Sequence, residues 1–71
     1  MKLTAVIEQG ENGWLVGQIE ELPAVMSQGK TTQELKENLL DALHLYLETQ
    51  KELTDEEYKG RIITREELIV A

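Results

Sequence analysis

A chain of 71 residues has room for one small domain, residues 1–71, and its formal net charge of −7 opposes direct binding to nucleic acid. The absence of cysteine excludes disulfides and thiolate metal sites as a means of stabilising so small a core. No apolar run approaches the length of a signal-peptide core or of a membrane span, so we expect a cytoplasmic protein without a membrane partner.

The chain begins with a pattern that predicts a β-hairpin. Residues 2–8 are rich in β-formers and contain no helix breaker, which favours a first strand. The pair Asn12-Gly13 predicts a type I′ turn, because both residues accept the positive φ that this turn requires. Residues 14–19 alternate as a second strand. The sequence leaves open whether its odd-numbered or its even-numbered residues face the core.

A third strand is expected after a short interruption. Residues 20–23 end in Pro23, which lacks a backbone donor, so a connection is predicted there. Residues 24–28 are short and apolar at their start, and Gly29 closes them. The prediction is therefore an antiparallel three-stranded meander.

An amphipathic helix over about residues 32–51 is the clearest element. Thr31 and Glu34 form a capping box immediately before its apolar run. The apolar stripe is wider than covering three strands requires, because leucines also flank it: Leu40, Leu45 and Leu47. We expect these leucines to contact a second subunit in a homo-oligomer, first of all a dimer, or to lie individually exposed.

The last third of the chain gives weaker signals. Thr54 and Glu57 form a second capping signal, but Gly60 follows so closely that it supports a single helical turn at most. Residues 61–70 have β-rich ends around a charged centre. A fourth strand is one interpretation of this tail and a helix is the other.

No pattern of catalytic or metal-binding residues is present. His44, the single histidine, lies on the polar side of the helix without a nucleophile or a second ligand, so a solvated side chain is favoured. Several helix carboxylates lie mostly on the outer side, where a solvated face is favoured over a Mg²⁺ site: Glu37, Asp41, Glu48 and Glu52. We expect neither enzymatic activity nor a cofactor.

The order of the features is more informative than any one of them. A hairpin through residues 11–14 is followed by a Leu-Pro turn within residues 19–25, by Ser-Gln-Gly-Lys-Thr at residues 27–31, and by the helix opening Glu-Leu-Lys-Glu-Asn-Leu at residues 34–39. Over about residues 2–50 this order resembles the HicB antitoxin family. Ala24 departs from the glycine that many members have after the proline, which affects the turn.

The resemblance implies an α+β domain of β-β-β-α-β order, similar to a degraded ribonuclease H fold without its nuclease activity. It also implies a partner, a small basic mRNA-cleaving toxin of the HicA type, and an acidic protein suits such a partner electrostatically. Many HicB proteins carry a C-terminal DNA-binding module. None is visible up to Ala71, so we expect a short form, and operator binding is in doubt.

Partner contacts are expected where acidic residues lie at strand ends and in the Leu-Pro turn, namely at Glu8, Glu20 and Glu21. Trp14 is either a binding hot spot or a cover for the sheet. Two other functions remain open: a stand-alone HicB-like oligomeric scaffold, and a metal-dependent nuclease that retains carboxylates of the ancestral fold.

Overall fold

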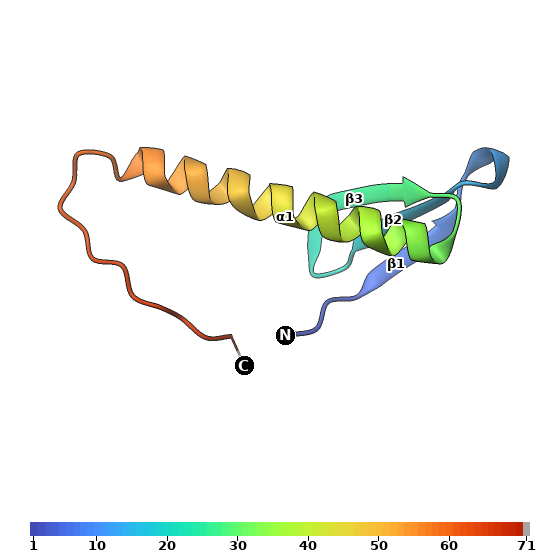
Figure 1. Ribbon diagram of the computed structural model, residues 1–71, viewed down its shortest axis with the longest axis horizontal. Coiled ribbons are helices and arrows are strands. Elements are labelled where there is room, and N and C mark those ends of the chain that lie inside the picture. The colour runs from blue at the N-terminus through green and yellow to red at the C-terminus, as the bar shows by residue number, and fades with distance from the viewer. Residues whose placement is uncertain (71) are drawn as a thin grey trace.

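The computed structural model describes residues 1–70 and consists of a small sheet and one long helix (Figure 1). Three antiparallel strands come first, in the sheet order β1-β2-β3: β1 (Ala5–Gln9), β2 (Leu15–Ile19) and β3 (Leu22–Gly29). The helix α1 (Thr32–Glu57) follows and packs on one face of the sheet. The predicted α+β meander with one long helix is confirmed.

The turn between β1 and β2 has the backbone that the Asn-Gly pair predicted. Asn12 (φ 56°, ψ 35°) and Gly13 (φ 79°) both lie at positive φ. The backbone N–H of Trp14 donates to the carbonyl of Glu11 at 3.1 Å, which closes the tight turn over Glu11–Gly13, η1. This turn twists in the sense that the two strands require, and it fixes their register.

The structure decides which residues of β2 face the core. Gly17 and Ile19 are buried against α1, so the odd-numbered residues point toward the helix. The even-numbered residues therefore lie on the opposite side of the sheet, because successive side chains of a strand alternate between its faces.

Strand β3 begins at Leu22, earlier than predicted, and it includes Pro23. The predicted connection over residues 20–23 is therefore reduced to Glu20 and Glu21. Proline is tolerated because β3 is an edge strand, paired with β2 on one side only. The amide of Gln18 donates to the carbonyl of Pro23 at 2.8 Å and supports the turn.

The core is small and aliphatic, and its buried side chains are Ile19, Val25, Leu35, Leu39 and Leu43. Leu35 is fully buried in a hollow between β2 and β3 that two glycines create. A Cβ on Gly17 would lie 3.0 Å from the Leu35 Cδ2 atom, and one on Gly29 would lie 2.7 Å from the Leu35 backbone nitrogen. The two glycines thus allow α1 to approach the sheet closely.

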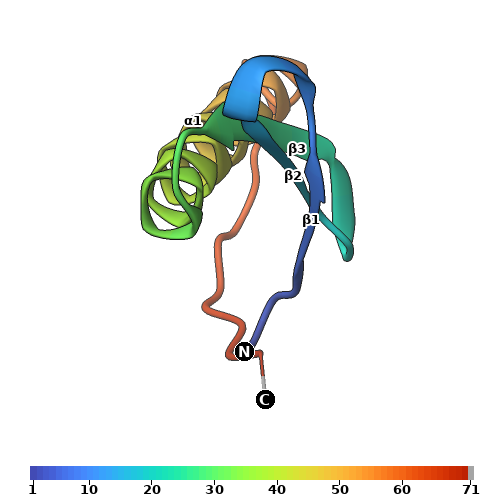
Figure 2. The same ribbon diagram turned by 90° about the vertical axis from the view of Figure 1, so that its right-hand side faces the viewer.

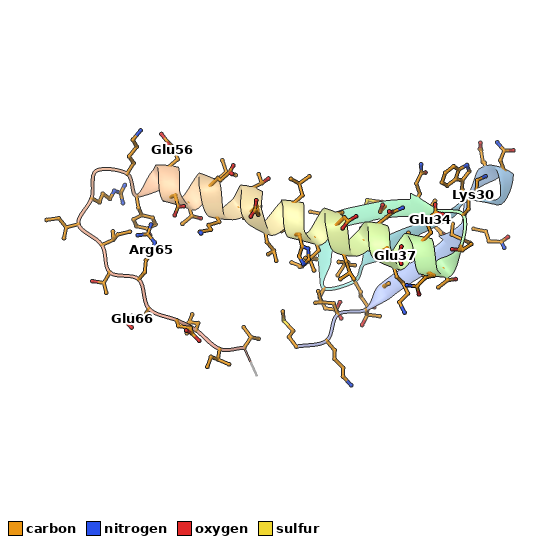
Figure 3. All side chains as sticks on the ribbon, in the orientation of Figure 1. Lys30, Glu34, Glu37, Glu56, Arg65 and Glu66 are labelled. Carbon is orange, nitrogen blue, oxygen red and sulfur yellow. The ribbon has the colours of Figure 1, made fainter. Side chains whose placement is uncertain are left out.

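The predicted capping box begins α1. The Thr31 hydroxyl accepts a hydrogen bond from the Glu34 N–H at 3.1 Å. The Glu34 carboxylate in turn accepts one from the N–H of Lys30 at 3.2 Å, one residue before the cap. Figure 3 shows Lys30 and Glu34 close together at the first turn, at the other end of the helix from Glu56 and Arg65.

The predicted end of the helix near residue 51 is wrong, because α1 continues without a break to Glu57. No glycine or proline lies between the start of α1 and Gly60, so the second capping signal, at Thr54, lies inside the same helix. A helix of 26 residues is roughly 39 Å long, whereas the longest strand, with 8 residues, spans only about 27 Å. The last turns of α1 therefore extend beyond the sheet (Figure 1).

Neither interpretation of the tail is correct within the described residues, because residues 61–70 form no strand and no helix. The fourth strand of the β-β-β-α-β order is thus not formed. The long helix explains this, since its end holds the first β-rich part of the tail away from every strand edge. The tail runs back from there, and both views bring its end near the N-terminus (Figures 1 and 2).

The two glycines under Leu35 give a graded test of the packing. Gly29→Ala is expected to destabilise the fold by about 1–3 kcal/mol, because its methyl group would meet the backbone of Leu35 and push the helix outward. Gly17→Ala should be milder, since its methyl group meets only leucine side-chain ends, which can turn. Urea unfolding followed by helix content measures both. Wild-type stability for Gly29→Ala would show that the helix is not seated on this glycine.

Candidate functional site

The face of the sheet that α1 leaves bare is the main candidate for a binding surface (Figure 2). The strand register places two rows of three side chains across it. We call these six residues the outer sheet face: Val6, Gln18 and Met26 in one row, and Glu8, Val16 and Gln28 in the other. Met26 is 56% exposed and Val6 is 51% exposed, so the two edge strands of this face present apolar side chains to solvent, on either side of Gln18.

Trp14 lies at one end of the outer sheet face, directly before β2, and is half-buried. The Lys30 ammonium group lies 4.3 Å from the centroid of the Trp14 ring, in cation–π geometry. The same ammonium group donates to the carbonyl of Asn12 at 3.0 Å. Lys30, which the sequence did not single out, therefore joins the hairpin turn to the start of the helix and covers part of the indole.

The predicted contact residues fall into two groups at opposite ends of the sheet. Glu8 pairs with Val16, near the end of β2 where Trp14 lies. Glu20 and Glu21 form the turn at the other end of β2, roughly 17 Å away over the five residues of the strand. The structure thus brings Glu8 and Trp14 to one end of the sheet and does not bring Glu20 and Glu21 to them.

Glu21 has an intramolecular role that the sequence did not reveal. Its carboxylate accepts two hydrogen bonds from Thr4, one from the backbone N–H at 2.7 Å and one from the hydroxyl at 2.8 Å. The N–H of Glu20 donates to the Thr4 carbonyl at 2.9 Å. This Thr4–Glu21 latch holds the start of β1 against the β2–β3 turn. Thr4 lies beside this turn because the next residue, Ala5, pairs with Ile19.

The latch also changes the acidity of Glu21. The backbone N–H of Thr4 contributes most to lowering the pKa of the Glu21 carboxyl, followed by the Thr4 hydroxyl and by the N–H of Glu21 itself. Hydrogen bonds to the carboxylate favour its charged form. A lowered pKa in the folded state means that the latch stabilises the fold above the ordinary glutamate pKa, and that this contribution is lost as pH falls.

The three leucines expected at an oligomer contact, Leu40, Leu45 and Leu47, are all exposed. Leu40 lines a cleft between α1 and the start of β1, which the sequence did not predict. We call it the β1 groove. It has a volume of about 160 Å³, is almost wholly apolar, and its lining includes Leu3, Ala5, Ile19, Lys36, Leu40 and Leu43.

Across residues 1–70, no three histidine, aspartate or glutamate side chains lie close enough together to hold a metal ion. His44 is exposed on α1. In the same part of the chain, no helix has both the length and the apolar character that crossing a membrane requires.

The chain is similar to small proteins from archaea and a cyanobacterium. It is 40% identical over 60 residues to a UPF0150 protein of Archaeoglobus fulgidus, which covers 84% of this chain and 87% of that protein. It is 37% identical over 51 residues to a UPF0150 protein of Thermoplasma acidophilum, covering 72% and 74% of the two chains. A UPF0150 protein of Synechocystis is 40% identical over 43 residues, covering 61% and 62%. No family model matches the chain, and no solved structure matches it significantly.

The latch predicts a stability difference that depends on pH. Glu21→Gln should lower the melting temperature by a few degrees near pH 7, where the native carboxylate is charged, and by less near pH 3, because the contribution of the charged carboxylate is lost as pH falls below the ordinary glutamate pKa. Glu20→Gln is the matched control, because that residue contributes only its backbone to the turn. Thermal unfolding at both pH values measures the effect. An equal loss at both would show that the Glu21 charge is not responsible.

Proposed function

The chain belongs to the UPF0150 family, and we propose that it is the antitoxin of a toxin–antitoxin pair, which binds and masks a small basic mRNA-cleaving toxin of the HicA type. The resemblance of residues 2–50 to HicB antitoxins supports this proposal. The observation that carries it is the outer sheet face, which is uncovered and exposes the apolar side chains of Val6 and Met26 in a chain of net charge −7. Because the toxin cleaves mRNA, both proteins would act in the cytoplasm.

Charge supplies the selectivity of this proposed binding. An enzyme that holds RNA needs a basic surface, and an acidic protein is steered toward such a surface faster than a neutral one. Glu8 lies on the outer sheet face itself, and Glu11 lies in the adjoining turn. Glu20 occupies the turn at the far end. Carboxylates at both ends of a face that also exposes apolar side chains match the usual combination of apolar contacts and a polar rim at an interface.

Binding alone is sufficient for inhibition. A protein seated on the RNA-binding surface of the toxin excludes RNA by competition, so this chain needs no catalytic group of its own. Met26 and Trp14 are the best anchors, since methionine adapts to an irregular partner surface and tryptophan contributes a large contact area. The contact between Trp14 and Lys30 holds the indole in place before the partner arrives.

The elongated form of the protomer favours a second candidate, an oligomeric scaffold that works without a toxin. Both candidates use binding surfaces and no chemistry. They differ in whether a small basic ribonuclease is the partner, and that difference can be measured directly.

The test of the antitoxin function pairs this protein with the product of a neighbouring gene, if that gene encodes a small basic protein, in an RNA-cleavage assay. The wild-type chain should protect RNA at about one equivalent. Met26→Lys puts a positive charge on the outer sheet face and should weaken inhibition about tenfold or more, through repulsion and lost apolar contact.

Leu45→Lys is the matched control for that test. It makes the same change of charge at a residue that is also exposed but lies on the helix, so it should inhibit as the wild type does. Equal weakening by both substitutions would assign the effect to net charge alone. No complex and no protection of RNA, with both proteins folded, would rule out the antitoxin function and favour the scaffold.

A further inference from the structure

The single chain is too extended to be a complete globule. A compact monomer of 8.1 kDa exposes about 4,500 Å², whereas this chain exposes 6222 Å². Its radius of gyration is 15.8 Å, against about 11 Å for a compact domain of this length. The excess surface is therefore roughly 1,700 Å², about twice the ~800 Å² that each partner buries in a standard protein interface.

The excess surface lies at the C-terminal end of the molecule, where α1 extends beyond the sheet and residues 61–70 form an arm (Figure 1). The end of this arm is apolar and open to solvent: Leu68 is 91% exposed, Ile69 is 85% exposed and Val70 is 63% exposed. Ile69 and Val70 are β-branched, and this residue type is enriched in strands.

The unpaired edge of β1 and the groove beside it match this apolar segment in chemical character. Among the described residues β1 pairs only with β2, so its other edge is free to accept a strand. The β1 groove lies between this edge and α1 and is lined almost wholly by apolar side chains. Lys36 is the charged residue of the lining. The arm carries the complementary sequence, because Glu66 and Glu67 directly precede its apolar end.

In the observed structure the arm of the same chain ends near the N-terminus (Figures 1 and 2) but does not line this groove. The Arg65 guanidinium contacts the Asp55 carboxylate at 3.1 Å, which places Arg65 beside the end of the helix. Beyond Arg65 the five residues to Val70 extend at most about 17 Å. The groove residue Leu40 lies about 22 Å back along α1 from Asp55, and Lys36 lies a full turn further.

We propose that the β1 groove receives the arm of a second copy of this chain, so that two protomers exchange their residues 66–70. The arm would pair with the free edge of β1, with Leu68 and Val70 in the groove and a glutamate facing Lys36. A two-fold dimer satisfies both copies at once and also covers the helix turns that extend beyond the sheet. This dimer is independent of toxin binding, because it leaves the outer sheet face free.

The mass in solution is the first test. Light scattering at micromolar concentration should give about twice the 8.1 kDa of one chain. The double variant Leu68→Ser with Val70→Ser should raise the dimer dissociation constant at least about tenfold, since two apolar side chains lose their burial. Leu45→Ser, on the other flank of α1, should leave it unchanged. A wild-type monomer, or a dimer that the double variant does not weaken, would overturn the proposal.

Cross-linking identifies the occupant of the groove, and the natural chain has no cysteine to interfere. A mixture of two single variants, Leu3→Cys and Val70→Cys, should give a covalent pair of different chains with a short bis-maleimide. The arm of one chain also ends near its own N-terminus (Figures 1 and 2), so a chain that carries both cysteines can link within itself in either case, and only the pair of different chains tests the exchange. A mixture of the two folded single variants that gives no covalent pair would overturn the proposal. Neither result depends on a toxin, so the dimer and the proposed function can fail separately.

Discussion

The packing of Leu35 into the hollow between Gly17 and Gly29 is the contact on which the rest of the structure depends. A core of five buried side chains supplies little stabilisation, so the helix must lie close to the sheet. Only residues without a side chain allow that approach at these two positions. The capping box begins the helix at Thr31, four residues before Leu35, and so determines where along the strands Leu35 packs.

One helix can cover only one side of a three-stranded sheet, and this limit creates the surfaces that are free to bind. The strand register fixes which residues each surface receives, because a shift by one residue would exchange the two faces. It gives the helix Gly17 and Ile19, and it leaves Val16, Gln18 and Met26 outside. The outer sheet face is thus a direct consequence of how the hydrophobic core is formed.

The difference in length between the helix and the sheet has a separate consequence. Because α1 continues to Glu57, its last turns have no strand beneath them, and the arm starts far from the sheet. Within the described residues the other edge of β1 is unpaired, and no residue of the tail lines the β1 groove. The proposed exchange of arms between two copies would fill both, and it uses a surface different from the one proposed for a toxin.

The sequence by itself determined the local elements, because their signals are local. The positive φ of Asn12 and Gly13, the cap at Thr31 and the amphipathic period of the helix all depend on residues within a few positions of one another. Where a signal depended on what lies nearby in space, the sequence was ambiguous or wrong. Pro23 inside an edge strand and the unpaired tail are examples.

The tertiary structure alone decided which face of β2 is buried, where the predicted contact residues lie, and that Thr4 holds Glu21. Each of these depends on strand pairing, which joins residues that are far apart along the chain; 17 positions separate Thr4 from Glu21. Strand pairing in turn depends on the packing of the helix over the two glycines. No local pattern of residues specifies such a long-range contact, and this is why it had to be read from the folded chain.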